Sequence, residues 1–189
     1  MQLTIASVTS LLLSCCLSDV EGRKFISTLS VTNGGKLGDW GEVQSCPKGY
    51  VDKFSLKIEA ERGAFDDDSS LNGIRLYCTD GSVITSLVGK YGDWSDQQSC
   101  KSGFLNSFSL QVSEPVKWAD ATAADNIKFK CTDGTELEGK GIDWGKYGSW
   151  STSCPKHGIC GIQTRVEITG RQPNRDVSGL NDVKFFCCH

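Results

Sequence analysis

Short stretches in which apolar and polar residues alternate dominate the chain. One set begins eight residues after a cysteine in each case, and its members are 54–58, 108–112 and 162–166. A second set ends at a cysteine in each case, and its members are 74–78, 127–131 and 183–187. Alternation with period two is typical of strands that bury one face. The pattern therefore predicts paired strands, and no amphipathic helix of ordinary length is visible.

The same elements recur three times along the chain. Each copy has a Gly-x-Trp segment shortly before a cysteine, and the copies are 38–41 with Cys46, 92–95 with Cys100 and 148–151 with Cys154. The three cysteines lie 54 residues apart in both intervals. Asp-Gly pairs follow Cys78 and Cys131 and favour two-residue hairpins, because both central residues can reach positive φ. The sequence thus predicts a hairpin and a returning strand in the first two copies.

The third copy ends without a returning strand, whereas residues 25–32 form a strand-like stretch before the first copy. We expect this N-terminal strand to complete the third sheet. The result is an all-β architecture of three antiparallel sheets with pseudo-three-fold symmetry, whose apolar faces turn toward a common axis. A single short repeat cannot bury its strands alone, so the copies must pack on one another.

Composition agrees with a secreted all-β protein. The 189 residues are 38% hydrophobic and 23% charged with a formal net charge of −3, which favours neither disorder nor binding to nucleic acid. The 21 glycines and ten cysteines indicate many tight turns and cross-links. We expect a single domain over 23–189, made of three repeats of about 54 residues.

Residues 1–22 have the length and apolar character of a signal peptide, with cleavage after Ser18 or Gly22. The alternatives are a buried strand or an uncleaved anchor, since no Lys or Arg lies near Met1. No other stretch approaches the roughly 18 consecutive apolar residues of a membrane-spanning helix. The expectation is a secreted, extracellular protein without a membrane span.

Eight cysteines remain after the signal peptide, and the repeats restrict how they pair. The expected disulfides are Cys46–Cys78, Cys100–Cys131, Cys154–Cys187 and Cys160–Cys188. The partners of Cys187 and Cys188 remain interchangeable, because adjacent residues point to opposite faces of a strand. Loops of about 32 residues closed in this way each contribute roughly 3.5–4 kcal/mol in the chain-entropy account.

A zinc site is the competing interpretation of the last third of the chain. Its ligands would come from Cys154, His157, Cys160, Cys187, Cys188 and His189. Secretion oxidises such thiols, and the first four cysteines of the repeats show the same spacing without a histidine nearby. The sequence therefore favours disulfides and no metal.

The sequence contains few of the residues and motifs on which catalysis usually depends. The chain has only two histidines and no phosphate-binding or dinucleotide-binding glycine motif, so no cofactor is expected. Acidic residues recur in corresponding loops, and the catalytic candidates are Asp67, Asp68 and Asp120, with Glu59 or Glu167 as partners. Paired carboxylates can act as acid and base on a glycosidic bond. The same side chains also cap turns, which is the simpler interpretation, and calcium binding is a further alternative.

Tryptophan offers a second kind of candidate. Trp40, Trp94 and Trp150 recur in the repeats, which favours a role in the core or between sheets. Trp118 and Trp144 break the repeat and are the better candidates for a glycan-binding surface.

Several separate motifs, in order and with the matching cysteines, resemble the vitelline membrane outer layer protein family from about residue 31 to the end. They are 38–41 (Gly-Asp-Trp-Gly), 71–78 (Leu-Asn-Gly-Ile-Arg-Leu-Tyr-Cys), 84–86 (Ile-Thr-Ser), Trp144-Gly145 before 149–151 (Ser-Trp-Ser), 159–164 (Ile-Cys-Gly-Ile-Gln-Thr) and 180–183 (Leu-Asn-Asp-Val). The resemblance implies a β-prism of three Greek-key sheets, four disulfides and secretion into an egg coat or mucosal fluid. It also implies association with mucins and a transferase-like activity on N-acetylglucosamine oligomers.

The leading hypothesis is a disulfide-rich structural protein of an extracellular coat, the vitelline layer of an egg or a mucosal layer, that binds glycans or mucin-like glycoproteins. The alternative is a glycan-processing enzyme acting on N-acetylglucosamine oligomers. A membrane-active defence protein that uses the prism as a lectin-like module is a third possibility, which rests on fold analogy alone.

Overall fold

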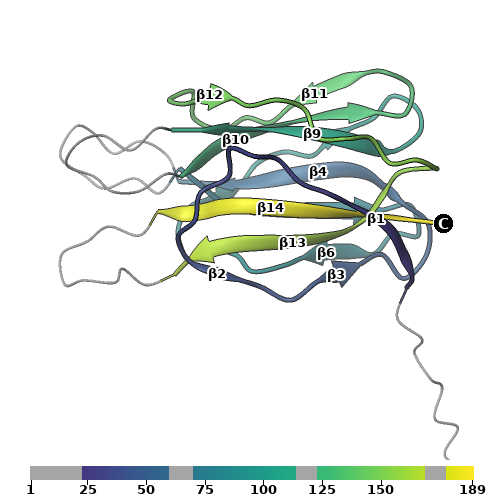
Figure 1. Ribbon diagram of the computed structural model, residues 1–189, viewed down its shortest axis with the longest axis horizontal. Helices are drawn as coiled ribbons and strands as arrows, with labels where there is room; N and C mark the ends of the chain where they lie inside the picture. The colour runs from purple at the N-terminus through teal and green to yellow at the C-terminus, as the bar shows by residue number, and fades with distance from the viewer. Residues whose placement is uncertain (1–22, 60–69, 114–122, 169–177) are drawn as a thin grey trace, which may run out of the picture.

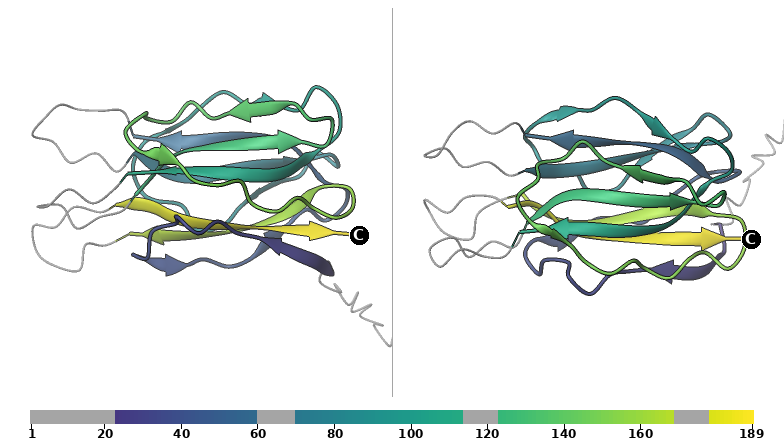
Figure 2. Two further views of the ribbon diagram at one scale, coloured as in Figure 1. Left: turned by 45° about the horizontal axis from the view of Figure 1, so that its top comes forward. Right: turned by 90° about the horizontal axis from the view of Figure 1, so that it is seen from above.

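Three antiparallel sheets lie around the long axis of the protein (Figures 1 and 2). The computed structural model describes residues 23–59, 70–113, 123–168 and 178–189. Within these ranges all regular structure is β-strand. The described residues include no helix that is long and apolar enough to cross a membrane.

Each sheet has a four-strand path of the same topology. The first sheet has the order β6 (Val83–Thr85), β5 (Leu71–Cys78), β4 (Val51–Ile58), β7 (Asp93–Trp94), and β8 (Gln98–Ser99) also pairs with β4. The second has the order β11 (Glu136–Glu138), β10 (Ala124–Cys131), β9 (Leu105–Val112), β12 (Lys146–Tyr147). The third has the order β1 (Phe25–Leu29), β14 (Gly179–Cys188), β13 (Ile159–Glu167), β2 (Asp39–Trp40), and β3 (Gln44–Ser45) also pairs with β13.

The order within each sheet is that of a Greek key, in which the fourth strand returns to lie beside the first. That fourth strand comes from the following repeat, so β7 completes the first sheet, β12 the second and β2 the third. The expectation that the N-terminal strand completes the third sheet is confirmed, because β1 pairs with β14 and places Leu29 opposite Phe185. The repeats therefore form a closed ring of sheets, as the predicted β-prism requires.

Phenylalanine side chains on the axis join the three sheets. Phe54, Phe108, Phe129 and Phe185 are each at most 1% exposed. The ring centroids of Phe129 lie 4.8 Å from Phe54 and 5.2 Å from Phe185, and Phe185 lies 4.8 Å from Phe108. Tilted and edge-on contacts of this kind are favourable beyond the apolar area they bury. The core therefore belongs to all three sheets at once.

Four disulfides lie at one end of the sheets, where β5, β10 and β14 finish. They are Cys46–Cys78, Cys100–Cys131, Cys154–Cys187 and Cys160–Cys188. These are the pairs that the repeat spacing favours, and Cys188 rather than Cys187 is the partner of Cys160. The thiols of the zinc interpretation are consumed in these bonds, so they are not available as metal ligands.

The third repeat is in a different register from the one its tryptophan suggests. Residues 148–151 were expected to match 38–41 and 92–95, but the strand that pairs with β9 is Lys146–Tyr147. Gly145 takes the place of Gly38 and Gly92, because a Cβ atom at any of the three would collide with the backbone of the neighbouring long strand. The physical reason is one additional residue between this glycine and the following cysteine in the third repeat.

Replacing Leu29 with alanine tests whether the closing strand is essential. The side chain is fully buried, so Leu29→Ala should lower the free energy of unfolding by about 2–5 kcal/mol. Thr28→Ala, at an exposed position of the same strand, is the control and should have little effect. Denaturant unfolding of the oxidised protein measures both. Equal unfolding midpoints for the two variants would show that β1 does not close the core.

Candidate functional site

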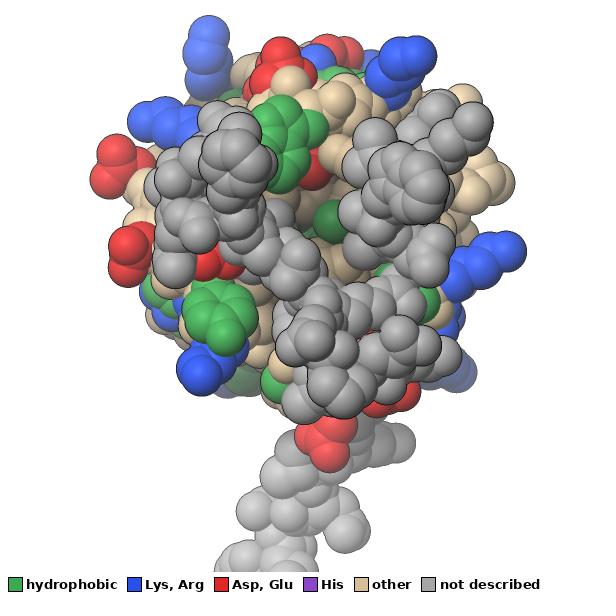
Figure 3. Space-filling model, turned by 90° about the vertical axis from the view of Figure 1, so that its left-hand side faces the viewer, with side chains coloured by type: hydrophobic (Ala, Val, Ile, Leu, Met, Phe, Trp, Pro, Cys, Tyr) green, Lys and Arg blue, Asp and Glu red, His purple; other side chains and the backbone are tan. Residues whose placement is uncertain are grey.

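The three long strand pairs β4–β5, β9–β10 and β13–β14 are connected at the end of the protein opposite the disulfides, and we call this the loop end. Figure 3 looks onto this end, where acidic and hydrophobic side chains lie among polar atoms and backbone. Asp67, Asp68, Asp120 and Trp118 fall in the connecting segments and lie outside the described residues. The described part of the loop end contains Trp144 and the buried residues on which the strands end.

A set of buried polar side chains recurs at the ends of these strands. In the third repeat, Glu167 Oε2 accepts a hydrogen bond from Ser178 Oγ at 2.7 Å, and Asn181 Nδ2 donates to the same Ser178 Oγ at 2.7 Å. In the second repeat, Ser113 Oγ donates to Asp125 Oδ2 at 2.5 Å. All five side chains belong to strand ends, and the four that are at most 5% exposed are Asp125, Glu167, Ser178 and Asn181.

Sequence analysis did not identify this network, although a signal for it exists. Asn72, Asp125 and Asn181 each lie six residues before the cysteine that ends the strand. The backbone carbonyls of these three residues also have the same role in each repeat. Each accepts a hydrogen bond from the segment that leads to the next short strand: Asn72 from Gly89, Asp125 from Ile142 and Asn181 from Gly35. The network therefore fixes the connections at the loop end in all three repeats.

Burial raises the pKa of two carboxyl groups at the loop end, those of Asp125 and Asp182. Removal from water raises the pKa of Asp125 above 3.8, and the hydrogen bond from Ser113 opposes this rise. Burial likewise raises the pKa of Asp182, against the stabilising hydrogen bond from the backbone of Val183.

Glu59 and Glu167, the expected partners of the loop carboxylates, are 4% and 2% exposed. Glu167 Oε2 also accepts hydrogen bonds from both the backbone N–H and the hydroxyl of Ser178. A general acid or base must reach a substrate atom within about 2.6–3.2 Å, or through one water. The position of these two side chains therefore favours a structural role in ending the strands.

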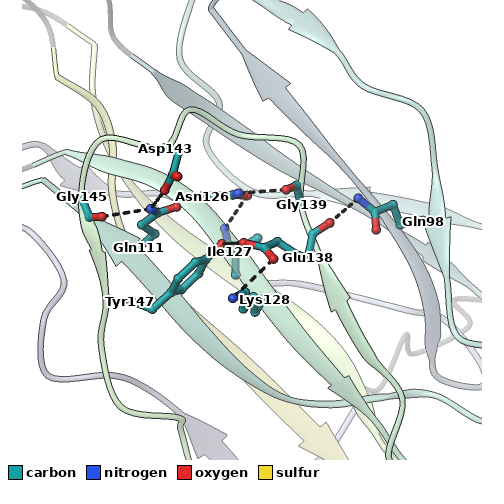
Figure 4. Close-up of polar contacts among 10 residues, drawn as sticks. All are labelled: Gln98, Gln111, Asn126, Ile127, Lys128, Glu138, Gly139, Asp143, Gly145 and Tyr147. Atoms are coloured by element: carbon teal, nitrogen blue, oxygen red, sulfur yellow. Dashed lines mark hydrogen bonds and ion pairs between the residues drawn. The ribbon is translucent and has the colours of Figure 1, made fainter.

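Trp144 is the most exposed tryptophan among the described residues, with 48% of its surface exposed. The turn that carries it is held by Gln111, which is 2% exposed (Figure 4). Gln111 Nε2 donates to Asp143 Oδ1 at 2.6 Å and to the carbonyl of Gly145 at 3.0 Å. The residues on both sides of Trp144 are thus anchored to β9. The ring is presented on a fixed turn, which reduces the entropy lost when a ligand binds.

The repeated tryptophans are not in the core, contrary to our expectation. Trp40 and Trp94 are half-buried and Trp150 is 37% exposed, all on the outer faces of the sheets. The third structural counterpart of Trp40 and Trp94 is Tyr147, which follows from the register of β12. The reason is that the long strands already fill the axis with phenylalanine, so the short strands can only cover the outside.

Each of these outer rings lies beneath a cation from the strand two places away. The cation lies 3.9 Å from the ring centroid for Arg75 over Trp94, 4.3 Å for Lys184 over Trp40 and 4.1 Å for Lys128 over Tyr147. Because the cation occupies the ring face, a sugar cannot stack there without displacing it. These pairs therefore stabilise the sheet faces, whereas Trp144 has no such cation among the described residues.

Glu138 completes the outer face of the second sheet (Figure 4). It accepts a hydrogen bond from Tyr147 Oη at 2.9 Å and lies 3.4 Å from Lys128 Nζ. Burial, followed by this acidic neighbour, raises the pKa of Tyr147 far above its usual range, so the phenol stays protonated.

Among the described residues no group of three or more His, Cys, Asp or Glu side chains is arranged to hold a metal ion. Asp125 and Glu167 instead accept hydrogen bonds from serine hydroxyls, and Asp182 accepts one from a backbone amide. This part of the site is thus built to hold strand ends together.

A sequence profile of the vitelline membrane outer layer protein I (VOMI) family matches residues 27–189. The chain is 42% identical over 180 residues to vitelline membrane outer layer protein 1 homolog from Homo sapiens, covering 90% of this chain and 88% of the relative. It is 46% identical over 180 residues to the homolog from Mus musculus, covering 89% and 86%.

Solved structures with similar folds include lectins. Calystegia sepium agglutinin superposes with a TM-score of 0.57 at 11% identity, covering 86% of this chain and 96% of the lectin. The mannose-binding lectin from Champedak superposes with a TM-score of 0.53 at 13% identity, covering 87% and 95%. At this level of identity the likeness establishes the β-prism fold alone.

Changing Asp125 to asparagine tests the protonation of the buried network. A carboxyl group whose pKa is raised on folding contributes stability at low pH, which is lost as the pH rises through the folded-state pKa. Asp125→Asn also reproduces Asn72 and Asn181 of the other repeats, and its amide oxygen can still accept from Ser113. We expect a higher melting temperature than wild type at neutral pH, and a difference that shrinks toward about pH 4. Thermal unfolding across this range measures it; a less stable variant at neutral pH would contradict the assignment.

Proposed function

Because the chain belongs to the vitelline membrane outer layer protein family, we propose that it is a secreted structural protein of an extracellular coat, either the vitelline layer of an egg or a mucosal layer. In this proposal it binds glycans or mucin-like glycoproteins through the loop end, with Trp144 and Trp118 as contact residues. Residues 1–22 act as the signal peptide and are removed after Ser18 or Gly22, leaving 23–189 as one domain.

The binding role rests mainly on the exposure and fixed position of Trp144. Its indole is 48% exposed, and the turn that carries it is anchored on both sides by the buried Gln111. The flat ring offers the kind of face on which the C–H groups of a pyranose pack. The similar solved structures include lectins, which supports the use of a β-prism for glycan binding.

The structural role is supported by the way the chain is closed. Four disulfides fasten the end of every long strand pair, and the first and last strands are hydrogen-bonded together. Disulfides persist in oxidising, extracellular environments. Such a domain resists unfolding and proteolysis outside the cell, as a coat component must.

We propose binding rather than turnover, because the two described carboxylates expected to take part, Glu59 and Glu167, are buried, and Glu167 is hydrogen-bonded to Ser178. Incubation with N-acetylglucosamine oligomers distinguishes the two functions. An unchanged chain-length distribution agrees with binding, and a redistribution of lengths would establish the enzymatic alternative, with Asp67, Asp68 and Asp120 as the first residues to substitute.

Trp144→Ala tests the binding role directly. We expect affinity for immobilised mucin or for N-acetylglucosamine oligomers to fall about tenfold, equivalent to roughly 1.4 kcal/mol, with little change in melting temperature. Trp150→Ala is the matched control, because it removes another exposed tryptophan from the same sheet, one that has Lys130 over its ring at 4.8 Å. Wild-type protein that bound neither mucin nor any glycan on an array would refute the proposal.

A further inference from the structure

Three loops meet at the disulfide end, and an aromatic side chain from each repeat lies there. Tyr50 precedes β4, Phe104 precedes β9 and His157 precedes β13. The ring centroid of Tyr50 lies 4.9 Å from Phe104 and 5.0 Å from His157, with the histidine ring stacked at 28°. We call Tyr50, Phe104 and His157 the aromatic cap.

The cap is open to solvent, unlike the phenylalanine core beneath it. Tyr50 and Phe104 are partly exposed and His157 is exposed. Gly158 makes room for the cluster, since a Cβ atom there would lie 2.6 Å from Cβ of Phe104. The three loops therefore leave a surface of stacked rings where the first, second and third repeats converge.

The backbone of His157 is unusual and places its ring in the cap. Its φ is 51°, a left-handed conformation that is uncommon for residues other than glycine. The corresponding residues of the other repeats are Gly49 and Gly103, with φ of 70° and 77°. Glycine would satisfy this turn without strain, and a strained residue held by a well-packed structure is a reason to look for function. The ring of His157, stacked on Tyr50, is what glycine would lack.

Cations surround the cap in a three-fold pattern. Lys48, Lys101 and Lys156 lie in the three converging loops, and all three are exposed. Arg23 is a fourth cation, with its guanidinium carbon 5.2 Å from the centroid of the Tyr50 ring and its Nη1 donating to the carbonyl of Cys46 at 3.1 Å. The exposed Lys24 lies next to it at the start of β1.

The carboxylates nearby are already engaged. Asp80 accepts from the backbone N–H of Lys48 at 2.9 Å, and Asp133 accepts from that of Ser102 at 3.0 Å. Hydrogen bonds in the two hairpins lower the pKa of both groups, so they stay charged. The third repeat has no such hairpin among the described residues, so Lys156 lacks the hairpin carboxylate that accompanies Lys48 and Lys101. Positive charge is therefore in excess at this end, most of all near His157 and Lys156.

We propose that the aromatic cap and its surrounding cations form a second binding site, specific for a sulfated saccharide. The exposed ring of His157 and the partly exposed ring of Phe104 would pack against the C–H groups of a sugar, whereas Arg23 already lies over the ring of Tyr50. Lys or Arg side chains would donate charge-assisted hydrogen bonds to the sulfate. This inference deepens the proposed glycan-binding function by adding a ligand class and a site at the end opposite Trp144. One molecule could then join two glycan chains, so that affinity for a multivalent coat exceeds that of either site.

Two variants of the full mature chain test this site with a heparin hexasaccharide as the probe. His157→Gly reproduces the other two repeats, so the fold should be retained and affinity should fall. Replacing Lys48, Lys101 and Lys156 together with glutamine should weaken binding at least about tenfold, because charge-assisted contacts are the stronger polar ones. Both variants should keep the wild-type melting temperature within the few degrees that surface changes produce.

The protein provides a matched control for the charge change. Lys36, Lys90 and Lys140 are also exposed and also recur in the three repeats, but they lie near the loop end, beside the segments that pair with Asn181, Asn72 and Asp125. Replacing these three lysines with glutamine removes the same charge and should leave hexasaccharide binding within about twofold of wild type.

Three results would overturn the site. The first is wild-type protein that does not bind the hexasaccharide at low salt while still binding mucin through Trp144; this leaves the proposed function intact. The second is equal weakening by the two lysine triples, which would mean general attraction of polyanions. The third is equally tight binding of a DNA oligonucleotide of matched charge, since the cap is expected to select the saccharide. Loss of mucin binding in Trp144→Ala alone bears only on the loop end.

Discussion

The structure depends on burying the apolar faces of strands that are too short to form a stable unit alone. Each long strand pair turns one face to the axis, where Phe54, Phe108, Phe129 and Phe185 contact one another across sheet boundaries. Two strands in water are marginally stable at best, and the repeats therefore need one another. Closure is completed by β1 on β14, so the beginning and the end of the described chain enter the same core.

This arrangement separates stability from recognition. The sides of the prism are covered by cation–aromatic pairs such as Arg75 with Trp94, which protect the single-layer sheets from solvent on their outer faces. Both proposed binding sites lie at the ends of the prism, where strands stop and loops begin. At the loop end, where Trp144 lies, buried acids, serines and amides hold the strand ends together by hydrogen bonds. At the other end, where Tyr50 and His157 lie, disulfides hold the strand ends together.

The two ends differ in the way they hold their strands, and their chemistry follows from that difference. Hydrogen-bonded carboxyl groups such as Asp125 make the loop end sensitive to protonation, because burial shifts their pKa. Disulfides carry no charge, and at their end the exposed Lys48, Lys101 and Lys156 lie in the loops that carry the aromatic rings. In the proposed coat function, unlike ends could engage unlike partners, and the core between them would fix the distance.

Sequence alone indicated the long strands, the three-fold repeat, the closing N-terminal strand and the pairs Cys46–Cys78 and Cys100–Cys131, because alternation and constant cysteine spacing can be read directly from the chain. The partners of Cys187 and Cys188 were left interchangeable, and the structure pairs them with Cys154 and Cys160. Tertiary structure decided the rest. Tyr147 rather than Trp150 takes the place of Trp40 and Trp94, and only the strand pairing reveals this correspondence. The hydrogen bonds that anchor Trp144 and the stacking of His157 on Tyr50 join residues far apart in the chain, so no local pattern encodes them.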